Sequence, residues 1–224
     1  RYFDANSGEM AVNKFAEGAK NEWYYFDQDG KAVTGLKTIN NQVLYFDQDG
    51  KQVKGQVVTL ADKSIRYFDA NSGEMAVNKF AEGAKNEWYY FDQDGKAVTG
   101  LQTINKQVLY FGQDGKQVKG QVVTLADKSI RYFDANSGEM VVNKFAEGAK
   151  NEWYYFDQDG KAVTGLKTIN NQVLYFGQDG KQVKGQVVYV DGAERYFDPK
   201  SGDMVRNKWI RLEDGTWMYF DRNG

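Results

Sequence analysis

The sequence predicts an all-β fold, a β-solenoid built from stacked β-hairpin repeats of 20–23 residues. The main observation is a Tyr-Phe pair that recurs along all 224 residues. The steps between successive pairs run 23, 20 and 22 residues, and this order recurs as a 65-residue super-repeat marked by Trp23, Trp88 and Trp153. Periods of this length are typical of arrays in which each unit buries its faces against its neighbours.

The composition supports strands and turns. Aromatic residues make up 15% of the chain, there are 24 glycines, and Pro199 is the one proline. Aromatic and β-branched residues favour strands, and glycine favours turns. No segment keeps a 3.6-residue apolar spacing beyond one or two turns, so no helix is expected.

Each Tyr-Phe pair precedes a turn signal, such as Asp27–Gly30 or the longer Asp4–Gly8. Asp and Asn bond their own backbone in turns, and glycine supplies positive φ. A short β run such as 31–34 follows, so we expect the hairpin to consist of Trp23–Phe26, the turn and this run. The phenylalanine of each pair is expected in the core, and the tyrosine beside it with its hydroxyl at the edge.

The repeat predicts one array over residues 1–224, with super-repeats at about 1–65, 66–130 and 131–194 and a partial one at 195–224. Arg1 matches Arg66 and Arg131, and the chain stops at a turn signal, so we expect a fragment of a longer array. Because nearly identical hairpins can pair with the wrong neighbour, self-association or domain swapping is a further expectation.

Several functional classes are disfavoured. The net charge is −2 with both signs interspersed, which argues against nucleic-acid binding. No apolar run is long enough for a membrane span. The chain has neither Cys nor His, which removes disulfides, thiolate metal sites and the usual general base. The motif Asp27-x-Asp29-Gly30 resembles half of a calcium loop but lacks the remaining ligands. We therefore expect no metal, no cofactor and no catalytic site in this chain.

The strand before each turn suggests which side chains face outward. The position before the Tyr-Phe pair holds Tyr24, Leu44 or Arg66 in the three kinds of hairpin. Because arginine is rarely buried without a partner, this position is expected on the open side. Alternation along a strand then places Trp23 on the other side, packed between hairpins.

The run after the turn carries a second signal. Gln52 and Lys54 project together on one strand face, next to the ring expected to be exposed. An aromatic ring, an amide and an ammonium group can bind a sugar, whose apolar face stacks on the ring while its hydroxyls need hydrogen bonds. Surface packing of the tyrosine and a solvated strand face remain alternatives. The candidate carbohydrate-binding residues are Tyr24, Gln52, Lys54, Tyr89, Gln117, Lys119, Tyr154, Gln182 and Lys184.

At Trp23–Gly30 and Val33–Leu36 the chain resembles the cell-wall-binding and choline-binding repeat superfamily. With its 65-residue alternation and Gln-x-Lys motif, it most resembles the C-terminal glucan-binding repeats of streptococcal glucosyltransferases. The resemblance implies a β-solenoid that binds α-glucans such as dextran through an aromatic ring, Gln and Lys. It also implies an extracellular or cell-surface parent enzyme that makes glucan from sucrose, with its catalytic domain outside this chain.

Two other functions stay open. Choline binding needs aromatic cages, and in choline-binding repeats a Trp follows Thr-Gly, where this chain has Leu36 or Gln56. Rings occur near that position only at Phe15, Phe80, Phe145 and Trp209. A structural spacer or docking arm is the third alternative. Clostridial toxin repeats share part of the layout, but the 65-residue alternation favours the glucosyltransferase kind.

Overall fold

The computed structural model describes all 224 residues and is all-β. Twenty strands form ten two-stranded sheets, each made of two strands that are consecutive in the chain. The chain divides into two compact units, unit 1 with residues 1–102 and 111–117, and unit 2 with residues 103–110 and 118–224. The predicted fold class of stacked hairpin repeats is confirmed.

The strands of unit 1 are β1 (Lys14–Glu17), β2 (Trp23–Phe26), β3 (Gly35–Ile39), β4 (Gln42–Phe46), β5 (Gln56–Thr59), β6 (Ile65–Phe68), β7 (Lys79–Glu82) and β8 (Trp88–Phe91). The boundary between the units falls inside β9 (Gly100–Ile104) and β10 (Gln107–Phe111). Unit 2 continues with β11 (Gln121–Thr124), β12 (Ile130–Phe133), β13 (Lys144–Glu147), β14 (Trp153–Phe156), β15 (Gly165–Ile169), β16 (Gln172–Phe176), β17 (Gln186–Val190), β18 (Ala193–Phe197), β19 (Lys208–Arg211) and β20 (Trp217–Phe220).

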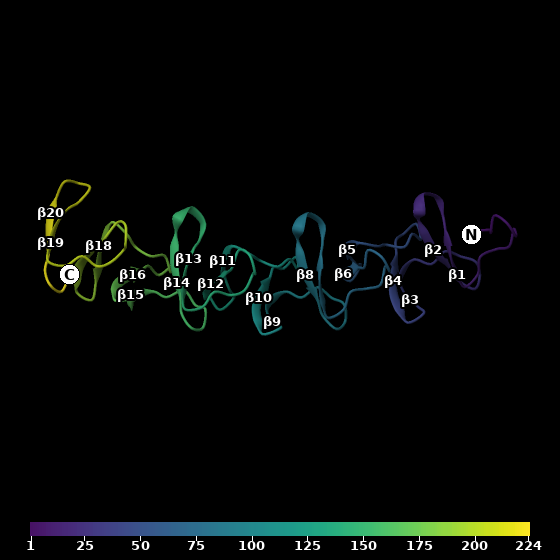
Figure 1. Cartoon of the computed structure of the whole chain (residues 1–224), viewed down its shortest axis with the longest axis horizontal. Coiled ribbons are helices and arrows are strands. Elements are labelled where there is room, and N and C mark those ends of the chain that lie inside the picture. The colour runs from purple at the N-terminus through teal and green to yellow at the C-terminus, as the bar shows by residue number, and fades with distance from the viewer. The chain divides into compact units, whose positions relative to one another are not determined.

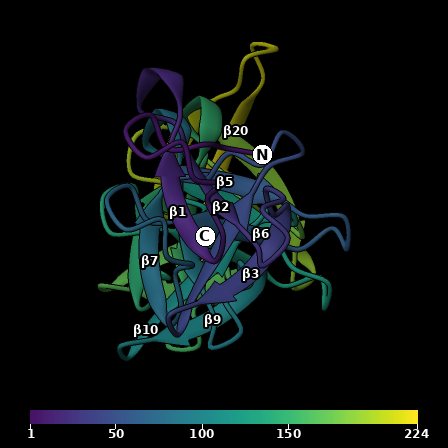
Figure 2. The same ribbon diagram turned by 90° about the vertical axis from the view of Figure 1, so that its right-hand side faces the viewer.

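The only helical residues are three short 3₁₀ turns, which the sequence did not signal, at Ala19–Asn21, Ala84–Asn86 and Ala149–Asn151. Each closes the loop of one hairpin per super-repeat. Within unit 1, Figure 1 shows the loop of the β1–β2 hairpin pointing to the opposite side from that of β3–β4. Figure 2 shows the β1–β2 hairpin, strand β3 and the β5–β6 hairpin at different positions around the unit.

The predicted hairpin boundaries are wrong. The longer antiparallel ladders form between the strand that contains the Tyr-Phe pair and the strand that precedes it in the chain. In β3 and β4, for example, Leu36 lies opposite Tyr45. Asn40 and Asn41, at φ 50° and 63°, form the connecting two-residue turn, as in a type I′ hairpin. The turn after the pair closes only a single bridge, as between Phe26 and Ala32.

Hydrogen bonding explains why the run after each turn does not extend a ladder. The N–H of Val53 donates to Tyr45 O of its own hairpin at 2.9 Å, whereas the N–H of Gln52 donates to Trp23 O of the preceding hairpin at 2.7 Å. Because neighbouring residues bond to different hairpins, the run cannot pair continuously with either one. It joins successive hairpins instead, which is how isolated two-stranded sheets become a stable array.

The core is a row of phenylalanines, as predicted. Every phenylalanine of a Tyr-Phe pair from Phe26 to Phe220 is at most 4% exposed, whereas Phe3 is 58% exposed. In several hairpins the paired tyrosine contacts the phenylalanine of the next hairpin, as in Tyr45, whose ring stacks on that of Phe68 with the centroids 5.5 Å apart. Tyr25 instead packs edge-on against Phe15 of its own hairpin. The paired tyrosines are half-buried from Tyr2 to Tyr196, and Tyr219 is exposed.

Candidate functional site

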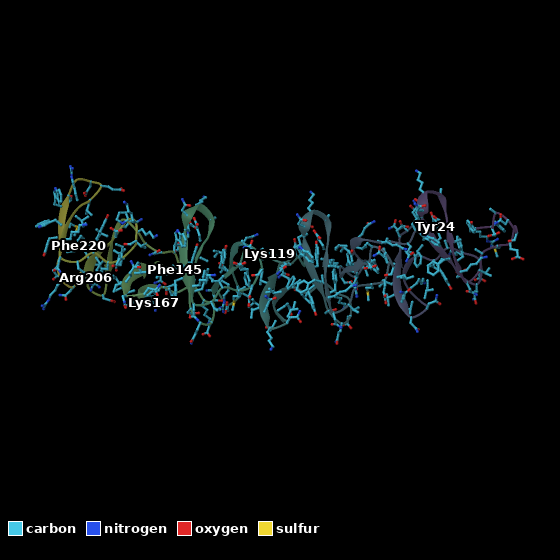
Figure 3. The ribbon with its side chains drawn as sticks, in the orientation of Figure 1. Tyr24, Lys119, Phe145, Lys167, Arg206 and Phe220 are labelled. Atoms are coloured by element: carbon cyan, nitrogen blue, oxygen red, sulfur yellow. The ribbon has the colours of Figure 1, made fainter.

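The tyrosine that precedes the Tyr-Phe pair in one hairpin of each super-repeat faces the core. Tyr89 and Tyr154 are 5% and 4% exposed, and Tyr24 is half-buried, with its ring centroid 6.3 Å from that of Phe26. Figure 3 places Tyr24 on the β1–β2 hairpin. The prediction that these tyrosines lie on the open side is wrong, and the buried rings of Tyr89 and Tyr154 leave no face for a ligand.

The error came from the arginine at the same strand position. Arg66 and Arg131 are only 7% and 8% exposed. Each guanidinium donates to a backbone carbonyl in the turn of the next hairpin, that of Asp94 for Arg66 and that of Asp159 for Arg131. A buried charge is tolerated when such acceptors satisfy it. The carbonyls come from residues 28 positions away, so the strand sequence does not reveal them.

The ring that faces outward is the tryptophan. Trp23 and Trp88 are each 37% exposed, and both lie at the loop end of their hairpins, opposite Glu17 and Glu82. The sequence analysis placed this tryptophan between hairpins and did not predict its exposed part. The strand alternation itself was correct, and only the choice of side was reversed. The 65-residue recurrence of Trp, together with Gln-x-Lys, was the signal that could have identified this ring.

The backbone places the Gln-x-Lys motif beside this tryptophan. The N–H of Gln52 donates to Trp23 O at 2.7 Å, and Gln117 to Trp88 and Gln182 to Trp153 repeat the bond at the same distance. In unit 1 a cavity of about 240 Å³ is lined by Phe15, Trp23, Gln42, Leu44, Gln52, Lys54 and Ser72. Ring, amide and ammonium group thus meet in one cavity, as predicted, but the ring is Trp23 rather than Tyr24.

In unit 2 a cavity of about 330 Å³ is lined in part by Trp153, Gln182 and Lys184. Its remaining lining, which includes Asn151, Asp179 and Lys181, differs from that of the unit 1 cavity. The Lys184 ammonium lies 5.7 Å from the centroid of the Trp153 ring, within cation–π range. In the middle copy, Trp88 and Gln117 belong to unit 1 and Lys119 to unit 2.

The Gln and Lys side chains are held by a turn farther along the chain. Gln52 Nε2 donates to Ser72 O at 3.4 Å, and Lys54 Nζ donates to Asn71 O at 3.1 Å. In unit 2, Gln182 bonds to Ser201 O at 3.3 Å and Lys184 to Lys200 O at 3.3 Å. Lys119 bonds to Asn136 O at 3.2 Å. Each bond uses one donor, so the amide oxygen and further ammonium hydrogens can serve a ligand.

An ion pair ties the same run to the tryptophan hairpin. Lys51 Nζ lies 3.0 Å from Glu22 Oε1, and the Tyr24 hydroxyl donates to the same carboxylate at 3.3 Å. The hydrogen bond from Lys51 lowers the pKa of Glu22 and raises that of Lys51, while burial raises the pKa of Tyr24. Lys116 with Glu87 and Lys181 with Glu152 repeat the pair at 2.8 Å.

The turns that hold Gln and Lys depend on ionised aspartates. A hydrogen bond from the backbone N–H of Ser72 is the main cause that lowers the pKa of Asp69. The N–H groups of Ser137 and Ser201 lower the pKa of Asp134 and Asp198 in the same way. A lowered carboxyl pKa gives stability that is present above the unfolded-state pKa and is lost as the pH falls through the folded-state value. We therefore expect resistance to urea to decrease as the pH falls below about 4.

Replacing the three aspartates by asparagine provides the control, because the amide oxygen still accepts the turn hydrogen bonds but does not titrate. The variant should lose less urea resistance than the wild type between about pH 5 and pH 2. Urea midpoints at several pH values measure this. Parallel pH dependence of the two proteins would show that these carboxylates do not carry the effect.

Stacked hairpins with a half-exposed ring, an amide and an ammonium group at regular intervals define a repeat protein built for binding. The chain belongs to the choline-binding repeat family, whose match covers residues 33–80, 98–145 and 163–209. Residues 17–32, 82–97 and 147–162 match the putative cell wall binding repeat. Both matches are to repeat families and not to a catalytic domain.

Curated relatives at high identity are streptococcal glucosyltransferases. Glucosyltransferase-S of Streptococcus mutans serotype c is 51% identical over an alignment of 225 positions, which covers the whole of this chain and 15% of that protein. Glucosyltransferase-I of Streptococcus downei is 39% identical, again over the whole chain and 20% of that protein. The chain thus spans about a fifth or less of the length of these relatives.

Solved structures share the fold. The modular autolysin LytC of Streptococcus pneumoniae aligns with a TM-score of 0.71 at 18% identity, over 98% of this chain and 50% of LytC. Choline binding protein F of the same organism aligns with a TM-score of 0.62 at 23% identity, over 90% of this chain and 76% of that one. At these identities the likeness concerns the arrangement of hairpins alone.

Two further findings limit the chemistry. Nowhere do three or more carboxylates gather closely enough to hold a metal ion. None of the helical segments has the length and apolar character that a membrane crossing requires.

Proposed function

We propose that this chain is a non-catalytic module that binds α-glucan polymers such as dextran at several sites, as part of a secreted, sucrose-dependent glucosyltransferase. The observation that carries the proposal is the outward tryptophan with Gln and Lys beside it, at Trp23 in unit 1 and Trp153 in unit 2. The identity with streptococcal glucosyltransferases supports the same ligand class.

Each site would bind one or two glucose residues. The apolar face of a pyranose stacks on the tryptophan, the glutamine oxygen accepts from one hydroxyl, and the lysine ammonium donates to another. A shallow site of this kind binds at about millimolar strength, near −4 kcal/mol. Because one polymer presents many equivalent residues, several sites together raise the apparent affinity by about 10² to 10⁴.

Such a module would hold growing polymer near the parent enzyme or attach a cell to glucan, and both roles place it outside the cell. The match to a putative cell wall binding repeat supports a surface location. Exchange of nearly identical hairpins between two copies of the chain would add further sites to one assembly and strengthen polymer binding.

Choline binding is the second candidate, because the family match favours it. The charges of the cavity oppose it. A quaternary ammonium ligand would lie over the aromatic ring, where unit 2 already has the Lys184 ammonium at 5.7 Å from the Trp153 centroid. Lys54 likewise lines the cavity with Trp23. Two like charges in one small cavity repel, so we expect neutral sugars to be preferred.

Retention on two matrices distinguishes the candidates. We expect the chain to be retained on insoluble dextran and released by soluble dextran, and to pass through choline-agarose. Retention on choline-agarose that free choline reverses, without retention on dextran, would favour the second candidate. Passage through both columns would remove both binding functions and leave a structural spacer.

A further inference from the structure

The candidate site in unit 1 is assembled from three successive hairpins. Trp23 lies on β2, Gln52 and Lys54 follow β4, and the turn at 69–74 follows β6. The carbonyls of Asn71 and Ser72 in this turn accept from Lys54 Nζ and Gln52 Nε2. The third hairpin therefore contributes no ring or ionic group to the site, but it holds both of the polar side chains.

A glycine leaves the space in which the glutamine amide lies. A Cβ at Gly73 would overlap Gln52 Nε2 and would lie 3.1 Å from Gln52 Cδ and 3.2 Å from Lys54 Cγ. Gly202 in unit 2 has the same relation to Gln182 Nε2, with Gln182 Cδ at 3.0 Å and Lys184 Cγ at 3.3 Å. Both contacts involve the two side chains that the proposed sugar site uses.

The same turn occurs once without a Gln-x-Lys motif beside it. Gly8 has φ +73°, against +75° for Gly73, and Asp4 bonds within its turn as Asp69 does. A Cβ at Gly8 would have no heavy atom within 4 Å. The turn therefore needs glycine for its positive φ in every copy, while Gly73 and Gly202 also lie against a glutamine side chain and Gly8 does not.

We propose that Gly73 and Gly202 are positioning residues for sugar binding, and that each site is complete only when the turn of the third hairpin is in place. The inference rests on the proposed glucan-binding function and adds to it. It places the functional units at about residues 23–73 and 153–202, so the first site crosses the boundary at 65/66 that the sequence period suggests. The final partial repeat then supplies an essential part of the last site.

The test compares G73A/G202A with G8A by NMR, with isomaltotriose as the probe. The indole N–H signals of Trp23, Trp88 and Trp153 are followed separately, and the signal of Trp88 serves as an internal control. In the double variant we expect the dissociation constants at Trp23 and Trp153 to rise about tenfold, which corresponds to the loss of about one well-formed hydrogen bond. Binding at Trp88 should be unchanged, and G8A should leave all three sites unchanged.

A second pair, G73N/G202N, guards against an effect of backbone strain, because asparagine tolerates positive φ but still fills the space beside glutamine. It should weaken the same two sites. The side-chain NH₂ signals of Gln52 and Gln182 should move in both double variants, which a merely structural role of the glycines would not produce. Wild-type affinity at Trp23 and Trp153 in these variants overturns the positioning role but leaves glucan binding intact. Absence of any tryptophan response in the wild type overturns the proposed function and this inference with it.

Discussion

Replacing Trp23, Trp88 and Trp153 together by alanine is expected to abolish retention on dextran. Each substitution removes the ring on which a glucose residue stacks, and the polar groups that remain bind sugar poorly without it. Because retention depends on several weak sites acting together, their combined loss should lower the apparent affinity for the polymer by about 10² to 10⁴. Binding of the variant to dextran, measured against that of the wild type, gives the result.

The fold should survive this change, because Trp23 and Trp88 are more than a third exposed and the phenylalanine core is untouched. Far-UV circular dichroism checks this. The matched control is W209A/W217A, which removes two exposed tryptophans from β19 and β20, where neither ring lines the cavities of the proposed sites. This control should retain dextran binding. If it loses binding as completely as the triple variant, or if the triple variant binds normally, the assignment of the stacking ring is wrong.

Replacing Phe91 by alanine is expected to produce the largest loss of stability. Phe91 is fully buried in a cluster with Ala76, Ala81 and Tyr89, and its ring also lies 6.2 Å from that of Tyr67 on the preceding hairpin. Truncation of a buried phenylalanine costs about 3–5 kcal/mol, from lost transfer free energy and the cavity left behind. In a stacked array the loss should weaken the neighbouring hairpins first.

Phe3 provides the control for Phe91, because it holds the same place in its Tyr-Phe pair but is 58% exposed. Phe3→Ala should change the free energy of unfolding by only about 0.5 kcal/mol or less. Urea unfolding followed by tryptophan fluorescence compares the two variants. Similar losses in both would mean that the row of phenylalanines does not supply the main stabilisation.

Much of the candidate site could be predicted from local patterns. Gln52 and Lys54 are two residues apart in an extended run, so they were expected on one face, and both line the cavity in unit 1. The identity of the ring could not be predicted in this way. The choice of ring depended on whether Arg66, at the same strand position as Tyr24, is buried. Arg66 is buried because its guanidinium donates to a backbone carbonyl of another hairpin. Tyr24 and its equivalents were therefore assigned to the wrong side, and Trp23 was expected to pack between hairpins rather than to line the site.

The hairpin boundaries show the same limit. Turn residues such as Asp27 and Gly30 were recognised correctly, because a turn is stabilised by hydrogen bonds within a few residues. Whether the run after a turn forms a ladder with its own hairpin depends on which hairpin its backbone groups bond to. Gln52 bonds to one hairpin and Val53 to another, and no local preference reveals that division.

The sequence by itself determined the repeat, the all-β class, the row of buried phenylalanines and the pairing of Gln with Lys, because each follows from spacing or from contacts between near neighbours. Only the tertiary structure decided which ring lies beside the glutamine and the lysine, and that a turn from a third hairpin holds these two side chains. Both depend on hydrogen bonds to main-chain carbonyls, from Arg66 to Asp94 and from Gln52 to Ser72. Every residue has such a carbonyl, so its role becomes visible only when distant hairpins are brought together.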